Sequence, residues 1–82
     1  MRVAVKLPDM GTPRVTFSLW YVRPGDTVWE GDRLAEVLIP GATYDVPAPA
    51  DGVLVEQQAF PNDHLVPGQV LGWIEAEEPQ RP

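Results

Sequence analysis

The sequence predicts an all-β domain, on the basis of its turn residues and of the segments between them. Ten prolines and seven glycines are spread over 82 residues, which leaves no room for a helix longer than about two turns. The intervening segments are short and rich in the β-branched and aromatic residues that favour strands. We expect one domain over residues 1–76, followed over 77–82 by a polar, proline-containing tail or the start of a linker.

The first two strands are predicted from the alternation of apolar and polar residues. Arg2–Leu7 alternates with a period of two, which places Val3, Val5 and Leu7 towards a core. Val15–Arg23 is the longest candidate. Its alternation places Val15, Phe17, Leu19 and Tyr21 on one face, and Trp20 and Val22 on the other. Because apolar residues lie on both faces at its end, we expect the strand to be covered on both sides there.

A β-hairpin is predicted in the middle of the chain. After a short strand at Thr27–Val28, the apolar run Arg33–Leu38 leads into Ile39-Pro40-Gly41-Ala42, and the strand Thr43–Val46 follows. Proline favours the first corner of a type II turn, and glycine tolerates the positive φ of the second. Pro40 and Gly41 are therefore expected to form the tip of the hairpin.

The second half contains a connector and two further long strands. Two prolines in Pro47-Ala48-Pro49-Ala50 exclude a helix and a central strand, so this segment is expected to be extended. Asp51-Gly52 is the best hairpin dipeptide in the chain. The strands Gly52–Gln58 and Gln69–Ala76 complete the predicted set.

An internal repeat divides the chain into two similar halves. Residues 23–34 match residues 60–71 at a constant spacing, with Pro24 aligned to Pro61 and Asp26 to Asp63. Gly25 aligns with a residue that also tolerates positive φ, Asn62. We expect two similar half-sheets related by an approximate two-fold axis.

Composition narrows the class of partner. The net charge of −6 and the pI near 4.4, with basic residues scattered along the chain, argue against nucleic acid. No apolar run is long enough to cross a bilayer, and the absence of cysteine fits a reducing compartment. We expect a cytoplasmic protein that contacts neither membranes nor nucleic acid.

Catalytic and metal-binding chemistry find little support. A nucleophile–base pair would need Ser18, the only serine, beside His64, the only histidine. Ser18 falls inside a strand, and His64 is expected to be a solvated loop residue. The acids of the repeated turns are expected to cap those turns and not to hold a metal. Trp20 and Trp73 are expected in the core, and Trp29 partly exposed.

Several segments together resemble the lipoyl domain of 2-oxo acid dehydrogenase complexes. They are Lys6–Gly11, Trp20–Val28, Glu30–Leu34, Leu34–Pro49 and Gly68–Glu75, so the resemblance covers nearly the whole chain. It implies a flattened β-barrel of two short antiparallel sheets with quasi-two-fold symmetry, and termini at the end opposite the hairpin tip. The biotinyl domain shares this fold, but its Met-Lys-Met hairpin is absent here.

The resemblance also identifies a missing residue. The lipoyl hairpin of the family reads Glu-Thr-Asp-Lys-Ala, and its lysine carries lipoate; here Leu38 to Ala42 match it, with Gly41 in place of that lysine. The only lysine, Lys6, falls in the first predicted strand. We therefore expect neither lipoate nor biotin at this turn.

The functional prediction follows from this departure. We expect a non-enzymatic, degenerate lipoyl-like domain that acts as a docking module, with subunits of a 2-oxo acid dehydrogenase complex as candidate partners. Exposed apolar residues at the tip would form the contact: Leu38, Ile39, Pro40, Gly41 and Tyr44. Two alternatives stay open, a true lipoyl or biotinyl carrier domain of an acyltransferase component and an unmodified structural spacer of the kind found in efflux adaptor proteins. A simpler explanation is that Pro40-Gly41 only forms a stable turn and that the tip has no contact function.

Overall fold

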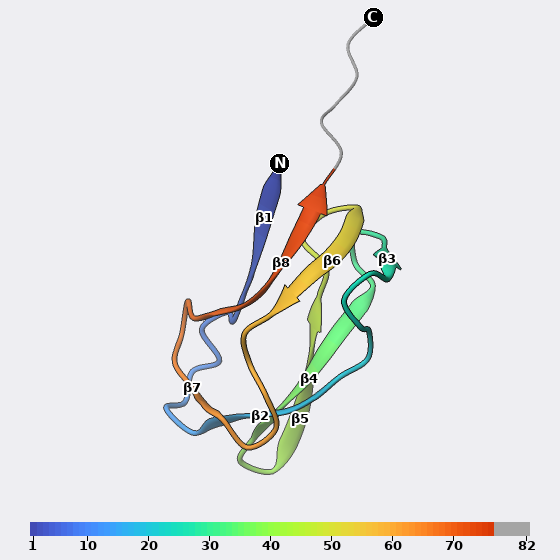
Figure 1. Cartoon of the computed structure of the whole chain (residues 1–82). Helices are drawn as coiled ribbons and strands as arrows, with labels where there is room; N and C mark the ends of the chain where they lie inside the picture. Colours follow the sequence, from blue (N-terminus) through green and yellow to red (C-terminus); the bar gives the residue numbers. More distant parts are fainter. Residues whose placement is uncertain (77–82) are drawn as a thin grey trace, which may run out of the picture.

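A computed structural model describes residues 1–76 and shows two four-stranded antiparallel sheets (Figure 1). The strands of one sheet run in the order β1-β8-β6-β3, and those of the other in the order β5-β4-β2-β7. The all-β prediction is confirmed. The strand bounds are β1 Arg2–Lys6, β2 Val15–Trp20, β3 Thr27–Val28, β4 Arg33–Ile39, β5 Ala42–Pro47, β6 Gly52–Gln57, β7 His64–Leu65 and β8 Val70–Ala76.

Apolar side chains from both sheets form one core, and no polar side chain of the described residues is buried with them. Both sheets contribute, for example through Phe17 and Leu34 from one and Leu54 and Leu71 from the other, all completely buried. Val5 and Leu7 are buried as predicted, whereas Val3 is only half-buried. Burial of apolar area is therefore the main stabilising contribution.

The predicted repeat has the same backbone geometry in both halves. In the first, the Asp26 carboxylate accepts the N–H of Arg23 at 2.8 Å; in the second, Asp63 accepts the N–H of Phe60 at 2.9 Å. The turn residue between them has a positive φ in both, 98° at Gly25 and 75° at Asn62. Strand β2 thus corresponds to β6, β3 to β7 and β4 to β8.

Two reciprocal hydrogen bonds join the halves. The indole Nε1 of Trp20 donates to the carbonyl oxygen of Ala59 at 2.8 Å, and Nε2 of Gln57 donates to the carbonyl oxygen of Val22 at 2.9 Å. Trp20 and Gln57 occupy equivalent positions in the repeat, as do Val22 and Ala59. Each half therefore satisfies a buried or half-buried carbonyl of the other.

A β-bulge in β2 overturns part of the predicted alternation. The pairing of β2 with β4 shifts between Phe17 and Leu19, and an extra residue in a strand reverses the faces beyond it. Leu19 and Tyr21 are therefore 39% and 42% exposed, so the predicted face shared with Val15 and Phe17 and the predicted cover on both sides of the strand end are wrong. Trp20 and Val22 pack against the core instead. The equivalent bulge lies between Leu54 and Glu56.

Asp51-Gly52 does not form a hairpin. Gly52 begins β6, which pairs with β3 and β8 in the other sheet, so the segment after β5 crosses between sheets. Asp51 instead accepts the backbone N–H of Glu30 at 2.7 Å. A Cβ at Gly52 would collide with the carbonyl oxygen of Glu75, so glycine is required here by close approach and not by a turn.

The tryptophans differ in their environments. Trp20 packs against the core as predicted. Trp73 is half-buried but lies outside the core cluster, because Ile74 points inwards and adjacent residues of a strand face opposite sides. The core assignment of Trp73 is therefore wrong. Trp29 is 61% exposed.

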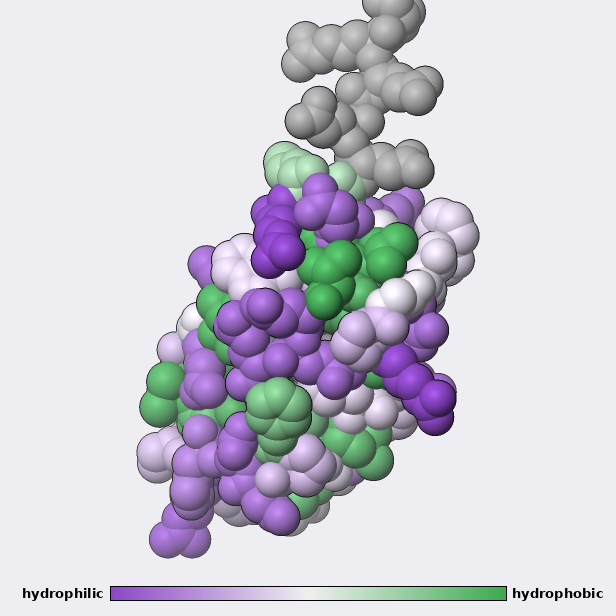
Figure 2. All heavy atoms as spheres, viewed as in Figure 1, coloured by the Kyte–Doolittle hydropathy of each residue, from purple (hydrophilic) through white to green (hydrophobic). Residues whose placement is uncertain are grey.

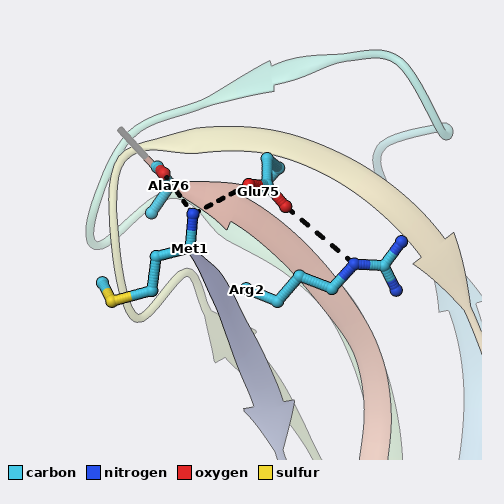
Figure 3. Close-up of polar contacts among 4 residues, drawn as sticks. All are labelled: Met1, Arg2, Glu75 and Ala76. Carbon is cyan, nitrogen blue, oxygen red and sulfur yellow. Dashed lines mark hydrogen bonds and ion pairs between the residues drawn. The ribbon is translucent and has the colours of Figure 1, made fainter. Parts of the chain in front are cut away.

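The start of β1 and the end of β8 lie together, at the end of the molecule opposite the turn between β4 and β5 (Figure 1). The N–H of Ala76 donates to the carbonyl oxygen of Met1 at 2.8 Å. The α-amine of Met1 donates to the Glu75 carboxylate at 2.8 Å and to the Ala76 carbonyl oxygen at 3.3 Å, and Arg2 lies 3.9 Å from Glu75 (Figure 3). The hydrogen bond from this amine lowers the pKa of Glu75.

The predicted tail over 77–82 lies outside the described residues. Within residues 1–76 there is no helix that would be long and apolar enough to cross a membrane.

Candidate interaction surface

Strands β4 and β5 form the predicted hairpin. Their pairing runs from Arg33 opposite Pro47 to Ile39 opposite Ala42, and Pro40 and Gly41 make the two-residue turn. Gly41 has a φ of 76°, as the second corner of a type II turn requires. A side chain added at this glycine would project into open space.

The five predicted contact residues divide into two sets. Leu38 is 41% exposed, and Pro40 and Gly41 are exposed at the turn. Ile39 and Tyr44 are half-buried and pack against the core. The expectation that all apolar residues of the tip stand clear of the core is therefore wrong for these two. The alternation of β4 carried this signal, because Ile39 shares a face with buried Val37.

Tyr44 borders an open hollow of about 230 Å³ between the edge strands β1 and β5. The chain's single lysine, at the exposed end of β1, also borders it. The lining residues are Lys6, Pro8, Tyr44, Val46, Pro47 and Pro49. Lys6 thus lies in a strand, as predicted, and not on a turn.

An acidic cluster lies on the solvent face of the hairpin. Glu36 on β4 is directly opposite Asp45 on β5. The hydroxyl of Tyr21 donates to Asp45 at 2.9 Å and is 3.2 Å from the Glu36 carboxylate. Arg33 places its guanidinium 5.2 Å from the centre of the Tyr21 ring, with Nη1 3.7 Å from Asp45. Three elements therefore converge here.

The electrostatic effect of this cluster is visible at the tyrosine. The hydrogen bond to Asp45 is the largest cause, followed by desolvation, the hydrogen bond to Glu36 and the negative charges of both carboxylates; together they raise the pKa of Tyr21 to about 12. Both carboxylates favour the neutral phenol, because its ionised form would place a third negative charge beside them. The cluster is thus a locally negative surface.

The sequence analysis did not predict this cluster, although the pair of carboxylates could have been predicted from the hairpin register. Counting outwards from the predicted turn places Glu36 opposite Asp45. Tyr21 was predicted to share a face with Val15 and Phe17 at a covered strand end, and the bulge in β2 brings it to the exposed side instead. No local pattern in the sequence marks that bulge.

Among residues 1–76, no hydrogen bond joins Ser18 to His64. Ser18 lies at the bulge of β2, and His64 is exposed in the short edge strand β7, opposite Thr16. His64 is therefore a strand residue and not the loop residue expected. The carboxylates of Asp26, Asp32 and Asp63 accept backbone N–H groups of their own turns, as predicted. Within residues 1–76, no three potential metal ligands gather.

Hydrophilic residues predominate on the face of the molecule drawn in Figure 2, and hydrophobic residues form small, separate patches among them. The exposed large apolar side chains come from several elements and from the loops between them. Leu19, Tyr21 and Leu38 are three of them.

Comparison with known proteins identifies the family. A family model described as "Biotin-requiring enzyme" (Biotin_lipoyl) matches residues 3–74. The chain therefore belongs to the biotinyl/lipoyl domain family, as the sequence resemblance implied. The lipoyl domain of the 2-oxoglutarate dehydrogenase complex from Azotobacter vinelandii has the same fold, with a TM-score of 0.67, 22% identity, and coverage of 94% of this chain and 99% of that chain. The predicted flattened barrel is thus confirmed.

Among curated proteins, the chain is similar to acyltransferase components. It is 31% identical over 75 residues to the lipoamide acyltransferase component of the branched-chain alpha-keto acid dehydrogenase complex from Pseudomonas putida, covering 89% of this chain and 18% of that protein. It is 31% identical over 80 residues to the acetyltransferase component of the pyruvate dehydrogenase complex from Staphylococcus aureus, covering 95% and 19%. The chain spans less than a fifth of the length of these relatives.

Proposed function

We propose that this domain is a non-catalytic member of the biotinyl/lipoyl family that carries no prosthetic group at its hairpin turn and acts as a protein-docking module. Its partners in this proposal are subunits of a 2-oxo acid dehydrogenase assembly, and its location is the cytoplasm. The observation that carries the proposal is the turn itself. Pro40 and Gly41 occupy the tip of the family fold, and neither has an amine.

The turn does not fit an attached lipoyl or biotinyl group. Such a group is joined through an amide to a lysine amine, and the single lysine of the chain, Lys6, lies in β1 beside the hollow described above. Room is not the obstacle, since a side chain at position 41 would meet nothing within 4 Å. The missing amine and the positive φ of Gly41, which disfavours any other residue, are the obstacles.

The docking part of the proposal is supported by what the tip displays. Leu38 is exposed next to a turn that proline makes rigid, and Ile39 and Tyr44 hold that turn against the core. A rigid, exposed apolar contact loses little conformational entropy on binding. The similarity to acyltransferase components of two dehydrogenase complexes supports the class of partner.

The test combines the intact mass of the domain with site-specific cross-linking in its source cells. A photo-reactive residue at position 40 reports contacts of the tip, and the same residue at Val66, 62% exposed in the loop after β7, is the matched control. We expect an unmodified mass and cross-links from position 40 alone to a 2-oxo acid dehydrogenase subunit.

Other outcomes would identify the alternatives. A mass increase corresponding to a lipoyl or biotinyl group would overturn the proposal in favour of a carrier domain. An unmodified mass without cross-links from position 40 would overturn the docking role and favour a structural spacer.

A reconstructed turn tests the assignment of Gly41. The double variant Pro40→Asp/Gly41→Lys restores the Asp-Lys pair of the family's hairpin and so places an amine at the tip of the turn. We expect a co-expressed lipoate ligase to add a lipoyl group to this variant but not to the native domain, as measured by intact mass. An unmodified double variant that is folded would count against placing the family's lysine at position 41.

A further inference from the structure

We propose that the solvent face of the sheet β5-β4-β2 is a docking surface for a basic protein segment in which a Lys or Arg side chain is flanked by apolar ones. This inference rests on the docking function proposed above and specifies the chemistry of the partner. Its central residues are Leu19, Glu36 and Leu38, with Asp45 and Tyr21 beside them.

The strand pairing places these side chains on one face. Leu19 on β2 is directly opposite Glu36 on β4, and Glu36 is directly opposite Asp45 on β5. Leu38 lies two residues beyond Glu36 and therefore on the same side of β4. Leu19 and Leu38 are 39% and 41% exposed. Two apolar side chains thus flank one carboxylate.

The internal repeat provides a comparison for these two leucines. The position equivalent to Leu19 is Glu56, which also follows a bulge, and the position equivalent to Leu38 is Glu75, near the end of β8. Both glutamates are exposed. The same fold therefore accepts charged side chains at both places, and folding of the sandwich does not require leucine at either. Of the two sheets, only β5-β4-β2-β7 has apolar side chains at these two positions.

The charge of the face indicates a basic partner. Like charges directly opposite each other on neighbouring strands are destabilising, and Glu36 and Asp45 share one phenol hydroxyl. Arg33 approaches Asp45, at 3.7 Å, while among residues 1–76 no cation forms an ion pair with Glu36. A cation supplied by a partner would offset this repulsion at Glu36.

The same charges argue against a second copy of this chain as the occupant. A two-fold dimer through this face would bring two acidic clusters together, and the chain carries a net charge of −6. A basic segment is attracted by the same field, and the two leucines then select for apolar residues beside its cation.

A synthetic peptide of repeated Leu-Ser-Arg-Ser-Leu is the probe. In an extended chain, alternate residues share a side, so each unit presents Leu, Arg and Leu on one side, with the cation between two apolar side chains. Binding is measured by NMR titration of the ¹⁵N-labelled domain. We expect the amide signals of Leu19, Glu36 and Leu38 to shift, and those of β6 and β8 to stay in place.

Two pairs of variants separate specific docking from attraction to an acidic protein. Leu19→Ser/Leu38→Ser is compared with Val55→Ser/Val66→Ser, which removes exposed apolar side chains elsewhere without changing charge. Glu36→Gln is compared with Glu56→Gln, the same charge change on the other sheet. We expect the first member of each pair to weaken binding by about tenfold and the second to leave it unchanged.

The inference would be overturned if both variants of each pair weakened peptide binding equally, or if the amide signals of both sheets shifted. Only non-specific electrostatic attraction would then remain. Urea unfolding of each variant shows whether a lost interaction reflects lost folding. Cross-links from position 40 together with a failed peptide titration would retain the docking function and reject this face. An absence of cross-links together with a successful titration would reject the hairpin tip as the contact and retain the face.

Discussion

At the scale of single residues, the unusual group is Tyr21. Its hydroxyl lies between two carboxylates in an exposed position, whereas the sequence alternation placed the residue on the same face as buried Val15 and Phe17. The bulge in β2 moves Tyr21 to the opposite face, where it contacts both carboxylates.

The titration of Tyr21 is the first testable consequence. Its pKa is raised from 10.0 to about 12, so the interaction stabilises the fold fully below pH 10 and is lost as the pH rises through about 12. Asp45→Asn should move this pKa back towards 10, because it removes the largest cause. The ring-carbon chemical shift of Tyr21, followed against pH, measures both values. An unchanged titration in Asp45→Asn would show that the hydrogen bond is absent in solution.

Gly72 provides a second test at this scale. Its position in β8 is covered by Trp20, and a Cβ there would collide with the carbonyl oxygen of Glu56 and lie 3.0 Å from the Trp20 ring. Gly72→Ala should therefore reduce the free energy of unfolding by about 1–3 kcal/mol, as overpacking does. Urea denaturation monitored by tryptophan fluorescence measures the change. A midpoint equal to that of the native domain would contradict this packing.

At the scale of elements, the hairpin β4–β5 was predictable in nearly full detail. Pro40-Gly41 specified the turn, and the turn specified the register from Ile39–Ala42 outwards. The crossover after β5 could not be predicted in this way. Asp51-Gly52 has the composition of a turn, but its glycine is required because β8 approaches it closely. The bulges after Phe17 and Leu54 also escaped prediction, since tertiary packing and not local propensity fixes them.

The two apolar residues before the turn should respond differently to the same substitution. Leu38 faces solvent, whereas Ile39 packs against the core. Leu38→Ser should change the free energy of unfolding by no more than about 0.5 kcal/mol, as surface substitutions do. Ile39→Ser should lower it by more than about 1 kcal/mol, because apolar area is lost and a hydroxyl is placed against the core. Urea midpoints compare the two, and equal losses would mean that the tip packs differently.

At the scale of the whole molecule, the repeat in the sequence predicted the symmetry of the fold. The constant spacing of Pro24/Pro61 and Asp26/Asp63 became equivalent turns with equivalent hydrogen bonds. The interaction surface was less predictable, because it depends on the differences between the halves. The constant spacing already aligns Leu19 and Leu38 with two glutamates, but only the paired strands show that the two leucines share an exposed face.

The contact between Met1 and Ala76 is the two-fold counterpart of the closing pair Ile39–Ala42. Within residues 1–76, Met1 and Ala76 therefore lie as close together as the two residues that flank the turn of the β4–β5 hairpin. A circular permutant that joins Ala76 to Met1 through a Pro-Gly turn and opens the chain between Pro40 and Gly41 should fold to the same sandwich. Its ¹⁵N spectrum should match the native one away from both ends, and a molten or aggregated permutant would refute the equivalence. Because the α-amine of Met1 becomes an amide, the pKa of Glu75 should rise towards its ordinary value.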